Sequence, residues 1–400
     1  MTTDLAKKTV LVIDDFQNMR ATLRQMLLSI GVQEVDSALK AEEALERMRA
    51  KRYDIVLCDY NLGSGMDGQQ LFEAARSEGI IGYGTTFIMV TAENSSEMVM
   101  GALEALPDAY LTKPFTKDLL RARLARALPR KAPLQKVDDA LRKGDSAAAI
   151  AHLDHLLAGN PANTPELLRL KAELALNGGD AATAAAACRQ ALEARPAAWA
   201  LTLLGRIAAR DGQPAEAEKL FREAIALTPA YMAAHDGLAA VLEAGGDAQA
   251  ACEVLVTAVE RSAKSLSRQL ALGRLAQALK KTDLAERAWR RAIALARQME
   301  RDHPAYHAAL AATLAMKGDG RGAQAALKKL AQEFRNHPET PWWTVAAKLN
   351  MLGAAPTDRT AVMQELDTLA QAGPPPKDAA AQLAPVLRAL GENERAERLA

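Results

Sequence analysis

Short apolar runs alternate with segments of helical periodicity along the first 128 residues. The apolar runs predict strands, because each is too short for a buried helix and ends in polar or turn-forming residues; they cover residues 9–13, 32–38, 54–58, 86–90 and 109–111. Apolar residues spaced three and four apart predict helices at residues 16–30, 41–50, 68–77, 95–106 and 116–127. This alternation predicts an α/β domain with a doubly wound, five-stranded parallel sheet and right-handed crossovers.

From about residue 134 the pattern changes to helices rich in alanine and leucine. Gly-Asp or related pairs punctuate these helices at residues 144–145, 179–180, 211–212, 246–247, 282–283, 318–319 and 391–392. Most intervals are near ~34 residues, which predicts an all-α solenoid of about seven or eight helix pairs over residues 134–400. In each pair, glycine closes the first helix and aspartate caps the second.

The clearest repeat, residues 198–231, places small residues where its two helices would cross closely and larger residues in the gaps. Its pattern residues are Leu201, Leu204, Gly205, Ala208, Ala217, Phe221, Ala224 and Pro229. They resemble the tetratricopeptide repeat, and the segments before and after match at corresponding positions. The match loosens towards both ends of the array, as expected for capping units.

Composition narrows the classes of function. The 400 residues are 49% hydrophobic and 25% charged with a net charge of +1, so we expect at least two domains and no attraction to nucleic acid or membrane. A DNA-binding regulator is disfavoured, because aromatic residues are 4% and no helix-turn-helix pattern occurs. Cys58, Cys188 and Cys252 stand in apolar contexts typical of small buried residues. With neither a secretory signal nor a membrane-spanning apolar run, a soluble cytoplasmic protein is expected.

The candidate chemistry lies at the ends of the predicted strands. Asp14, Asp15, Asp59, Thr91 and Lys113 all fall where a strand should emerge from the sheet. Since the carboxyl ends of parallel strands share one edge, these side chains should meet in the usual ligand crevice of an open α/β sheet. Three carboxylates in one place repel one another unless a cation joins them, and Mg²⁺ suits such oxygen ligands. The alternative is that these acids are ordinary turn residues or caps.

Phosphoryl transfer is the chemistry that this set favours. Mg²⁺, the ammonium group of Lys113 and the hydroxyl of Thr91 are what the charged oxygens of a phosphoryl group need. A carboxylate beside them can act as the nucleophile and form an acyl phosphate. The Lys113-Pro114 pair predicts an extended backbone, cis or kinked, that aims the lysine inward.

The motifs VLVIDD, Asp59, Thr91 and YLTKPF at residues 110–115 resemble the receiver domain of two-component response regulators. The resemblance covers residues 8 to about 128 and implies a flavodoxin-like fold. It implies that Asp59 accepts a phosphoryl group from a histidine kinase or a phosphotransfer protein, and that Thr91 and Lys113 hold the phosphoryl oxygens.

The same resemblance implies a metal site and a switch. Asp15 would be a direct ligand of Mg²⁺ with Asp14 alongside it, Asp59 would be the second ligand, and the backbone carbonyl of Asn61 the third. Tyr110 would be the aromatic residue that turns inward when Thr91 moves; the alternative is a plain half-buried tyrosine. The loop YNLGSGMDG after Asp59 departs from the family: it lacks the usual proline and is one residue longer, and its glycines at positions 63 and 65 predict flexibility.

Tetratricopeptide solenoids resemble one another in function through a concave groove that takes up a peptide or a partner helix. The candidate groove residues here are Arg169, Arg206, Arg210, His235 and Arg274. No nucleophile, base and orienting group converge in the repeats. His152 and His155 are spaced three apart, which permits metal binding geometrically but favours a surface or packing role.

Between the two parts, Pro129 and Pro133 predict a linker over residues 129–133. A basic run precedes and enters it, formed by Arg121, Arg123, Arg126, Arg130 and Lys131. This run could attract phosphate, but a solvated helix face is favoured. The glycine-rich stretch GIIGYGTTF at residues 79–87 has no function in this interpretation.

Taken together, these features predict a response regulator whose output is protein binding. Phosphorylation would shift the face formed by the fourth helix, fifth strand and fifth helix, and so change homodimerisation or the exposure of the groove. No enzymatic activity is expected beyond the receiver's own phosphoryl transfer and dephosphorylation. The alternative is a constitutive scaffold or adaptor whose receiver no longer signals.

Overall fold

The computed structural model describes residues 5–63, 65–92, 107–299, 301–352 and 358–399. These residues form two compact units, Met1–Gly245 and Gly246–Ala400, each of which is described by itself. The helix expected at residues 95–106 lies outside the described residues.

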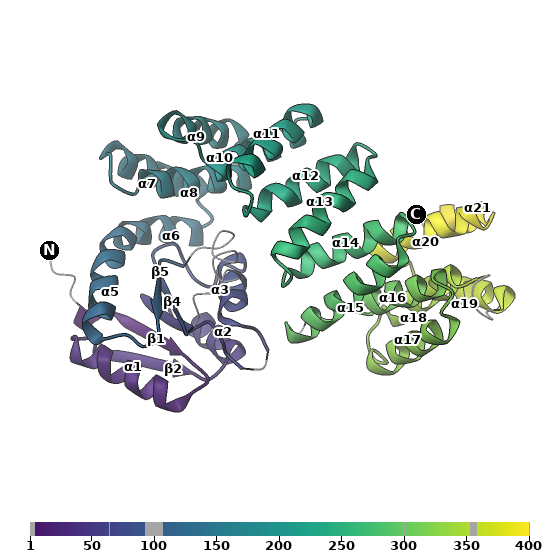
Figure 1. Cartoon of the computed structure of the whole chain (residues 1–400), viewed down its shortest axis with the longest axis horizontal. Coiled ribbons are helices and arrows are strands. Elements are labelled where there is room, and N and C mark those ends of the chain that lie inside the picture. The colour runs from purple at the N-terminus through teal and green to yellow at the C-terminus, as the bar shows by residue number, and fades with distance from the viewer. Residues whose placement is uncertain (1–4, 64, 93–106, 300, 353–357, 400) are drawn as a thin grey trace. The chain divides into compact units, whose positions relative to one another are not determined.

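The first part of the chain is a five-stranded sheet in the order β2-β1-β3-β4-β5 with all pairs parallel, as the sequence predicts. The strands are β1 (Thr9–Ile13), β2 (Glu34–Ala38), β3 (Ile55–Asp59), β4 (Thr86–Thr91) and β5 (Ala109–Thr112). Figure 1 shows them surrounded by helices in the purple to blue part of the chain. The central strand β3 is buried along its whole length, so its apolar run is dictated by helices on both faces.

Four described helices flank the sheet: α1 (Gln17–Ser29), α2 (Ala41–Ala50), α3 (Gly68–Ser77) and α5 (Lys117–Lys131). Leucines of α1 and α5 form one core layer with inward residues of the strands, including Leu23, Leu27, Leu120, Leu124, Val10, Val12, Ile55 and Leu57. On α3, Phe72 packs against Phe87 of β4 with ring centroids 4.7 Å apart. The predicted alternation of buried strands and amphipathic helices therefore yields a three-layered domain.

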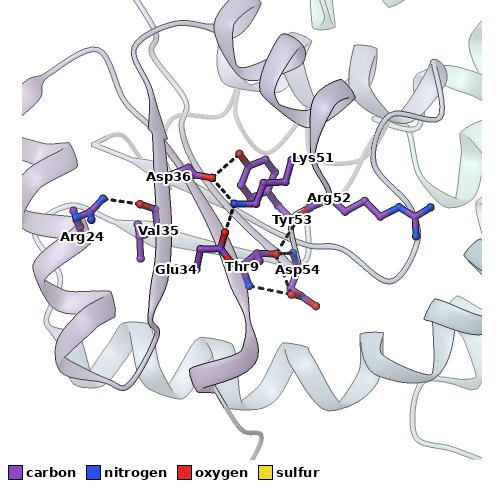
Figure 2. A network of polar contacts seen from close by, with 9 residues as sticks. All are labelled: Thr9, Arg24, Glu34, Val35, Asp36, Lys51, Arg52, Tyr53 and Asp54. Carbon is purple, nitrogen blue, oxygen red and sulfur yellow. Dashed lines mark hydrogen bonds and ion pairs between the residues drawn. The ribbon is translucent and has the colours of Figure 1, made fainter.

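A polar network secures the amino ends of β1, β2 and β3, opposite the edge where the candidate chemistry falls (Figure 2). Lys51 donates to Glu34 and, over 2.7 Å, to Asp36, and the Tyr53 hydroxyl donates to the same Asp36 oxygen over 2.9 Å. Burial, followed by the contact with Asp36, raises the pKa of Tyr53 to about 12. These contacts connect the amino ends of the three strands, and the candidate chemistry falls at the opposite, carboxyl edge of the sheet.

The expected linker over residues 129–133 is helical in the structure. Helix α5 continues through Pro129 to Lys131, and a 3-10 helix (η2, Ala132–Leu134) leads directly into α6 (Gln135–Arg142). Proline removes one backbone hydrogen bond from a helix. Here the buried Leu128 and an ion pair of 2.7 Å between Lys131 and Asp108 hold the helix together past that position.

The glycine-rich stretch at residues 79–87, which has no function in the sequence analysis, contacts helix α6. The carboxylate of Asp138 accepts the backbone N–H groups of Tyr83 and Gly84, both over 2.7 Å. A methyl group on Gly82 would lie 2.3 Å from the same carboxylate, and one on Gly84 would lie 2.7 Å from Gln135. Residues 82 and 84 must therefore be glycine for α6 to dock here.

The rest of the chain is helical, as predicted for tetratricopeptide repeats. Helices α6 to α21 follow one another along the chain. Beyond α6 they are α7 (Ser146–Ala158), α8 (Thr164–Asn177), α9 (Ala181–Ala194), α10 (Ala198–Arg210), α11 (Pro214–Leu227), α12 (Met232–Ala244), α13 (Ala248–Arg261), α14 (Leu266–Ala278), α15 (Thr282–Gln298), α16 (Pro304–Met316), α17 (Gly320–Glu333), α18 (Thr340–Asn350), α19 (Arg359–Ala372), α20 (Lys377–Ala389) and α21 (Asn393–Leu399). Helices α6 to α12 belong to the unit Met1–Gly245 and helices α13 to α21 to the unit Gly246–Ala400 (Figure 1).

The Gly-Asp pairs act as predicted at four turns. Glycines 144, 179, 246 and 318 have φ between +73° and +88°, a left-handed conformation that other residues rarely adopt. The aspartates that follow, at positions 145, 180, 247 and 319, cap the next helix by accepting a backbone N–H over 2.8–2.9 Å. The turn before α15 differs: Lys280 takes the left-handed position at φ +56° and no side chain caps the helix.

Phe221 of α11 shows how the repeats pack. Its ring fits between Gly205 of α10 and Gly237 of α12, where an added methyl group would lie 2.9 Å and 2.4 Å from the ring. The ring is 1% exposed. The small and large positions of the repeat pattern are thus complementary surfaces of neighbouring helices.

Replacing Phe221 with alanine should lower the free energy of unfolding by about 3–5 kcal/mol, because a buried ring is lost and two glycines cannot fill the cavity. Thermal unfolding followed by far-ultraviolet circular dichroism measures the loss. Leu227→Ala on the same helix is the matched control, since Leu227 is 43% exposed. Equal losses in the two variants would contradict the packing role assigned to Phe221.

Candidate functional site

The structure brings the predicted strand-end residues together at the carboxyl edge of the sheet. Asp59 is the last residue of β3, Asp14 follows β1, and Lys113 follows β5. The Lys113 ammonium donates to Asp14 Oδ2 over 2.9 Å and to Asp59 Oδ2 over 2.8 Å. One lysine therefore bridges two carboxylates that lie far apart in the sequence.

Three carboxylates form the acidic side of this site. Asp14, Asp15 and Asp59 each offer an oxygen within 4.8 Å of the other two. Asp14 is fully buried and Asp59 is 6% exposed, while Asp15 Oδ1 is buried and has no hydrogen-bond partner among the described residues. An unsatisfied buried carboxylate oxygen beside two further carboxylates fits a divalent cation with oxygen ligands.

The electrostatics of the site reflect this crowding. Burial raises the pKa of the Asp59 carboxyl above its ordinary value, the hydrogen bond from Lys113 opposes the rise, and the nearby Asp14 charge adds to it. Burial disfavours the ammonium of Lys113, but its hydrogen bonds to Asp59 and Asp14 outweigh this and raise the pKa of Lys113. The lysine is therefore charged, and it partly neutralises the acids that it bridges.

Local backbone contacts hold these side chains in place. Asp14 Oδ1 accepts the N–H of Phe16 over 2.9 Å, and Arg20 donates to the Asp14 carbonyl over 2.6 Å. The N–H of Lys113 donates to the Thr91 carbonyl over 2.7 Å, and the Lys113–Pro114 peptide bond is cis. The predicted cis or kinked backbone is thus present, and the lysine points inward.

Thr91 and Tyr110, the expected switch pair, lie on β4 and β5. Thr91 is 2% exposed at the end of its strand. Tyr110 is half-buried, and its hydroxyl is buried without a hydrogen-bond partner in the described part of the chain. Burial, with a smaller contribution from Tyr60, raises the pKa of Tyr110 to about 12.

The backbone conformation of the loop after Asp59 requires glycine at two positions. Gly63 and Gly65 have φ of +75° and +98°, which other residues rarely adopt. A methyl group on Gly68 would lie 2.2 Å from the Asp59 carbonyl, so α3 starts directly against the end of β3. Asn61 is exposed, and its backbone N–H bonds to the Asp59 side chain.

Asp67 and Gln70 add to this anchoring. They form a reciprocal capping box at the start of α3, with both hydrogen bonds between 2.9 and 3.0 Å. The start of α3, at the residue that the sequence predicted, is therefore held by its contact with the end of β3 and by this capping box.

The candidate groove residues have different positions. Arg206 and Arg210 on α10 are exposed, and Arg169 on α8 pairs with Glu173 over 2.8 Å. His235 is 5% exposed, and its Nε2 contacts the Pro229 carbonyl at 3.0 Å. The His235 ring is therefore buried against the turn before α12, and its place in a groove stays a prediction.

Arg274 lines a cavity of about 960 Å³ in the unit Gly246–Ala400. Aromatic residues that the sequence analysis missed share this lining: Trp289, Tyr306 and Trp343. Tyr306 lies on α16, the first helix of its pair, and this position in the repeat could have indicated that it lines the cavity.

A second cluster of metal-ligating type lies near the start of α16. Asp302, His307 and Glu333 each offer an atom within 4.8 Å of the others. The Arg297 guanidinium pairs with Asp302 over 3.0 Å and also with Glu333. Arginine therefore supplies the positive charge here, and the cluster is an ordinary ion-pair network.

Comparisons with known proteins agree with this arrangement. Residues 10–125 match the family model described as the response regulator receiver domain, and residues 134–198 and 202–265 match the tetratricopeptide repeat. The chemotaxis protein CheY of Pseudomonas aeruginosa is 28% identical over 121 residues, 30% of this chain and 96% of that protein. The chemotaxis protein CheY-3 of Vibrio cholerae is 29% identical over 30% of this chain and 92% of its own length.

A solved CheY-like receiver domain of Methanospirillum hungatei is 30% identical, covers 31% of this chain and 96% of its own, and has a TM-score of 0.29. No helix in the described part of the chain combines the length and the apolar character that a bilayer crossing requires.

Proposed function

Residues 10–125 of this chain form a response regulator receiver domain and tetratricopeptide repeats follow from residue 134, and from this premise we propose a phosphorylation-dependent signalling protein. In this proposal Asp59 accepts a phosphoryl group from a sensor histidine kinase or a phosphotransfer protein. The repeats then give the output by binding another protein or peptide. The observation that carries the proposal is the contact of Lys113 with both Asp14 and Asp59.

The transfer step is a displacement at phosphorus. A carboxylate oxygen of Asp59 attacks the phosphorus atom of the donor's phosphohistidine, a new O–P bond forms, and the P–N bond breaks. The histidine ring leaves with the bonding electron pair and takes up a proton. Lys113 is placed to contact a phosphoryl oxygen on Asp59, because its ammonium already lies 2.8 Å from the carboxylate. Thr91 would donate its hydroxyl to another of these oxygens.

Asp14, Asp15 and Asp59, with the backbone carbonyl of Asn61, are the residues proposed to hold Mg²⁺. Bound there, Mg²⁺ supplies positive charge that offsets the phosphoryl oxygens and the carboxylates. The unpartnered Asp15 oxygen and the proximity of the three acids support this assignment. Apart from this self-modification, the protein is proposed not to be an enzyme.

The route to the repeats is proposed to run through β5 and α5. Tyr110 lies on β5, α5 begins after Thr116, and α5 connects to α6 through the short helix η2 without a flexible linker. A shift of Tyr110 and Thr91 on phosphorylation would therefore reach the first repeat through helical backbone. Its effect on the output would be a change in groove exposure or in homodimer formation.

Acetyl phosphate tests the proposal without the unknown kinase. With Mg²⁺ present, the protein should gain one phosphoryl group, because the carboxylate of Asp59 attacks phosphorus and acetate leaves. Intact-mass spectrometry measures the gain, and borohydride trapping with peptide mapping locates it. Chelation of Mg²⁺ should prevent the reaction.

Uptake that persists in chelator, or a modified residue other than Asp59, would contradict the site assignment. The alternative of a constitutive scaffold predicts that beryllofluoride, a phosphoryl mimic, leaves the affinity of the repeats for a captured partner unchanged. A change in that affinity supports signalling through the receiver.

A further inference from the structure

A second cavity, of about 670 Å³, lies within the unit Met1–Gly245 and away from Asp59. Its walls come from α3, the start of β5, one face of α5, and the first turns of α8. Three arginines of the basic run, Arg123, Arg126 and Arg130, line it in a single stripe along α5. We name it the arginine cavity.

Positive charge in the arginine cavity exceeds negative charge. Its other cations have partners: Lys131 pairs with Asp108 over 2.7 Å, Arg169 pairs with Glu173 over 2.8 Å, and Arg76 donates to the Gly82 carbonyl over 2.6 Å. Within the described residues, no ion pair or hydrogen bond engages the side chains of the three α5 arginines. Glu166 is the one remaining acid of the lining, so three guanidinium groups face one carboxylate.

Two other cations of the arginine cavity, Lys131 and Arg76, are poorly solvated. Burial is the main influence on both Lys131 and Arg76, and it lowers the pKa of each despite the nearby carboxylate of Asp108. Arg123, Arg126 and Arg130 are themselves exposed, so an added anion can reach them, and it would lie beside these less solvated cations, where charges attract more strongly than in open water. The amino end of α8 adds to this preference, because its partial positive charge also faces the cavity through Asn163 and Glu166.

The remaining walls are apolar or aromatic. Phe72 and Tyr83 line one side, with the Arg76 guanidinium over both rings at 5.5 and 5.2 Å, and Leu134, Leu167 and Leu170 line another. Phe72 and the three leucines are almost fully buried, so the partly exposed Tyr83 supplies the accessible aromatic surface of this wall. Guanidinium groups bind phosphate oxygens through paired hydrogen bonds, and an aromatic side chain offers a flat surface to a planar organic ring.

We infer that the arginine cavity binds an organic phosphate of the nucleotide class with two or more phosphate groups. Residues 123 to 130 span about 10 Å of helix, which is enough for several phosphate oxygens to meet successive guanidinium groups. The volume lies in the range of small-molecule sites. This inference does not depend on phosphorylation of Asp59.

Titration of the full-length protein with a fluorescent ADP analogue, without Mg²⁺ and without a phosphoryl donor, tests the inference independently of Asp59. We expect saturable binding that Arg126→Ala/Arg130→Ala weakens by about tenfold or more, since two charge-assisted contacts are lost. Arg121→Ala is the matched control, because Arg121 lies on the same helix but does not line the cavity. Circular dichroism checks that the variants remain folded.

Competition separates the chemical sources of binding. Unlabelled ADP should displace the analogue, while adenosine should not and inorganic pyrophosphate should do so more weakly than ADP. Absence of saturable binding, or an equal loss in Arg121→Ala, would overturn the inference. Displacement by an acidic peptide as effective as ADP would overturn it as well, in favour of a protein segment as the occupant.

Discussion

Replacing Asp59 with asparagine should abolish phosphoryl uptake from acetyl phosphate completely. Asparagine keeps the shape of the side chain but offers an amide in place of the nucleophilic carboxylate, so the O–P bond cannot form. Asp14 cannot take over as the nucleophile, because it is fully buried and its carboxylate is held by the Phe16 N–H and by Lys113. Intact-mass spectrometry after incubation with Mg²⁺ and acetyl phosphate is the measurement.

Asp15→Asn provides the matched comparison within the same cluster. It weakens the proposed Mg²⁺ site but leaves the Asp59 carboxylate in place, so uptake should fall and then recover in part as Mg²⁺ is increased. Uptake by Asp59→Asn should not recover at any Mg²⁺ concentration. A phosphoryl group found on the Asp59→Asn protein would refute the role given to Asp59.

Replacing Asp138 with alanine should destabilise the unit Met1–Gly245 by several kcal/mol. The carboxylate is 5% exposed and is the acceptor for the N–H groups of Tyr83 and Gly84. Its removal leaves the buried N–H of Gly84 and the partly buried N–H of Tyr83 without this acceptor, and an unsatisfied buried donor costs about 1–3 kcal/mol. Urea unfolding should show an earlier first transition, and limited proteolysis should show faster cleavage near residues 79–85.

The neighbouring Asp139 supplies the control. It is exposed, pairs with Arg142 on its own helix, and lies 3.9 Å from Arg52. Surface ion pairs contribute about 0–1 kcal/mol, so Asp139→Ala should change the transition little. If Asp138→Ala unfolds like Asp139→Ala, the docking of α6 on the glycine-rich stretch does not contribute to stability.

The sequence predicted the elements whose physical cause is local. β1 and β3 follow from runs of apolar residues that must be buried on both faces, and the helix at residues 41–50 matches the structure to the residue. The meeting of Asp14, Asp59 and Lys113 was also predictable, since parallel strands present their carboxyl ends at one edge. The Gly-Asp turns were predictable because their cause is local: the glycine takes a left-handed backbone conformation, and the aspartate caps the helix that directly follows it.

Features that depend on distant contacts were not predictable. Nothing near residues 82 and 84 shows that their glycines admit a carboxylate from position 138. His235 was named as a candidate groove residue, but its burial depends on how α12 is rotated against α11. Pro129 indicated a boundary, whereas the ion pair of Lys131 with Asp108 and the buried Leu128 carry the helix through it.

The hydrogen bonds from the backbone of residues 83 and 84 to Asp138 limit where this receiver can be joined to another output domain. Shuffling of signalling proteins, in evolution or at the bench, joins a receiver to a new output near the end of its last helix. Here a junction at the end of α5 would remove α6, and the N–H groups of Tyr83 and Gly84 would lose the carboxylate of Asp138 as their acceptor. A functional chimera is therefore expected to keep α6 with its receiver and to be joined after Arg142.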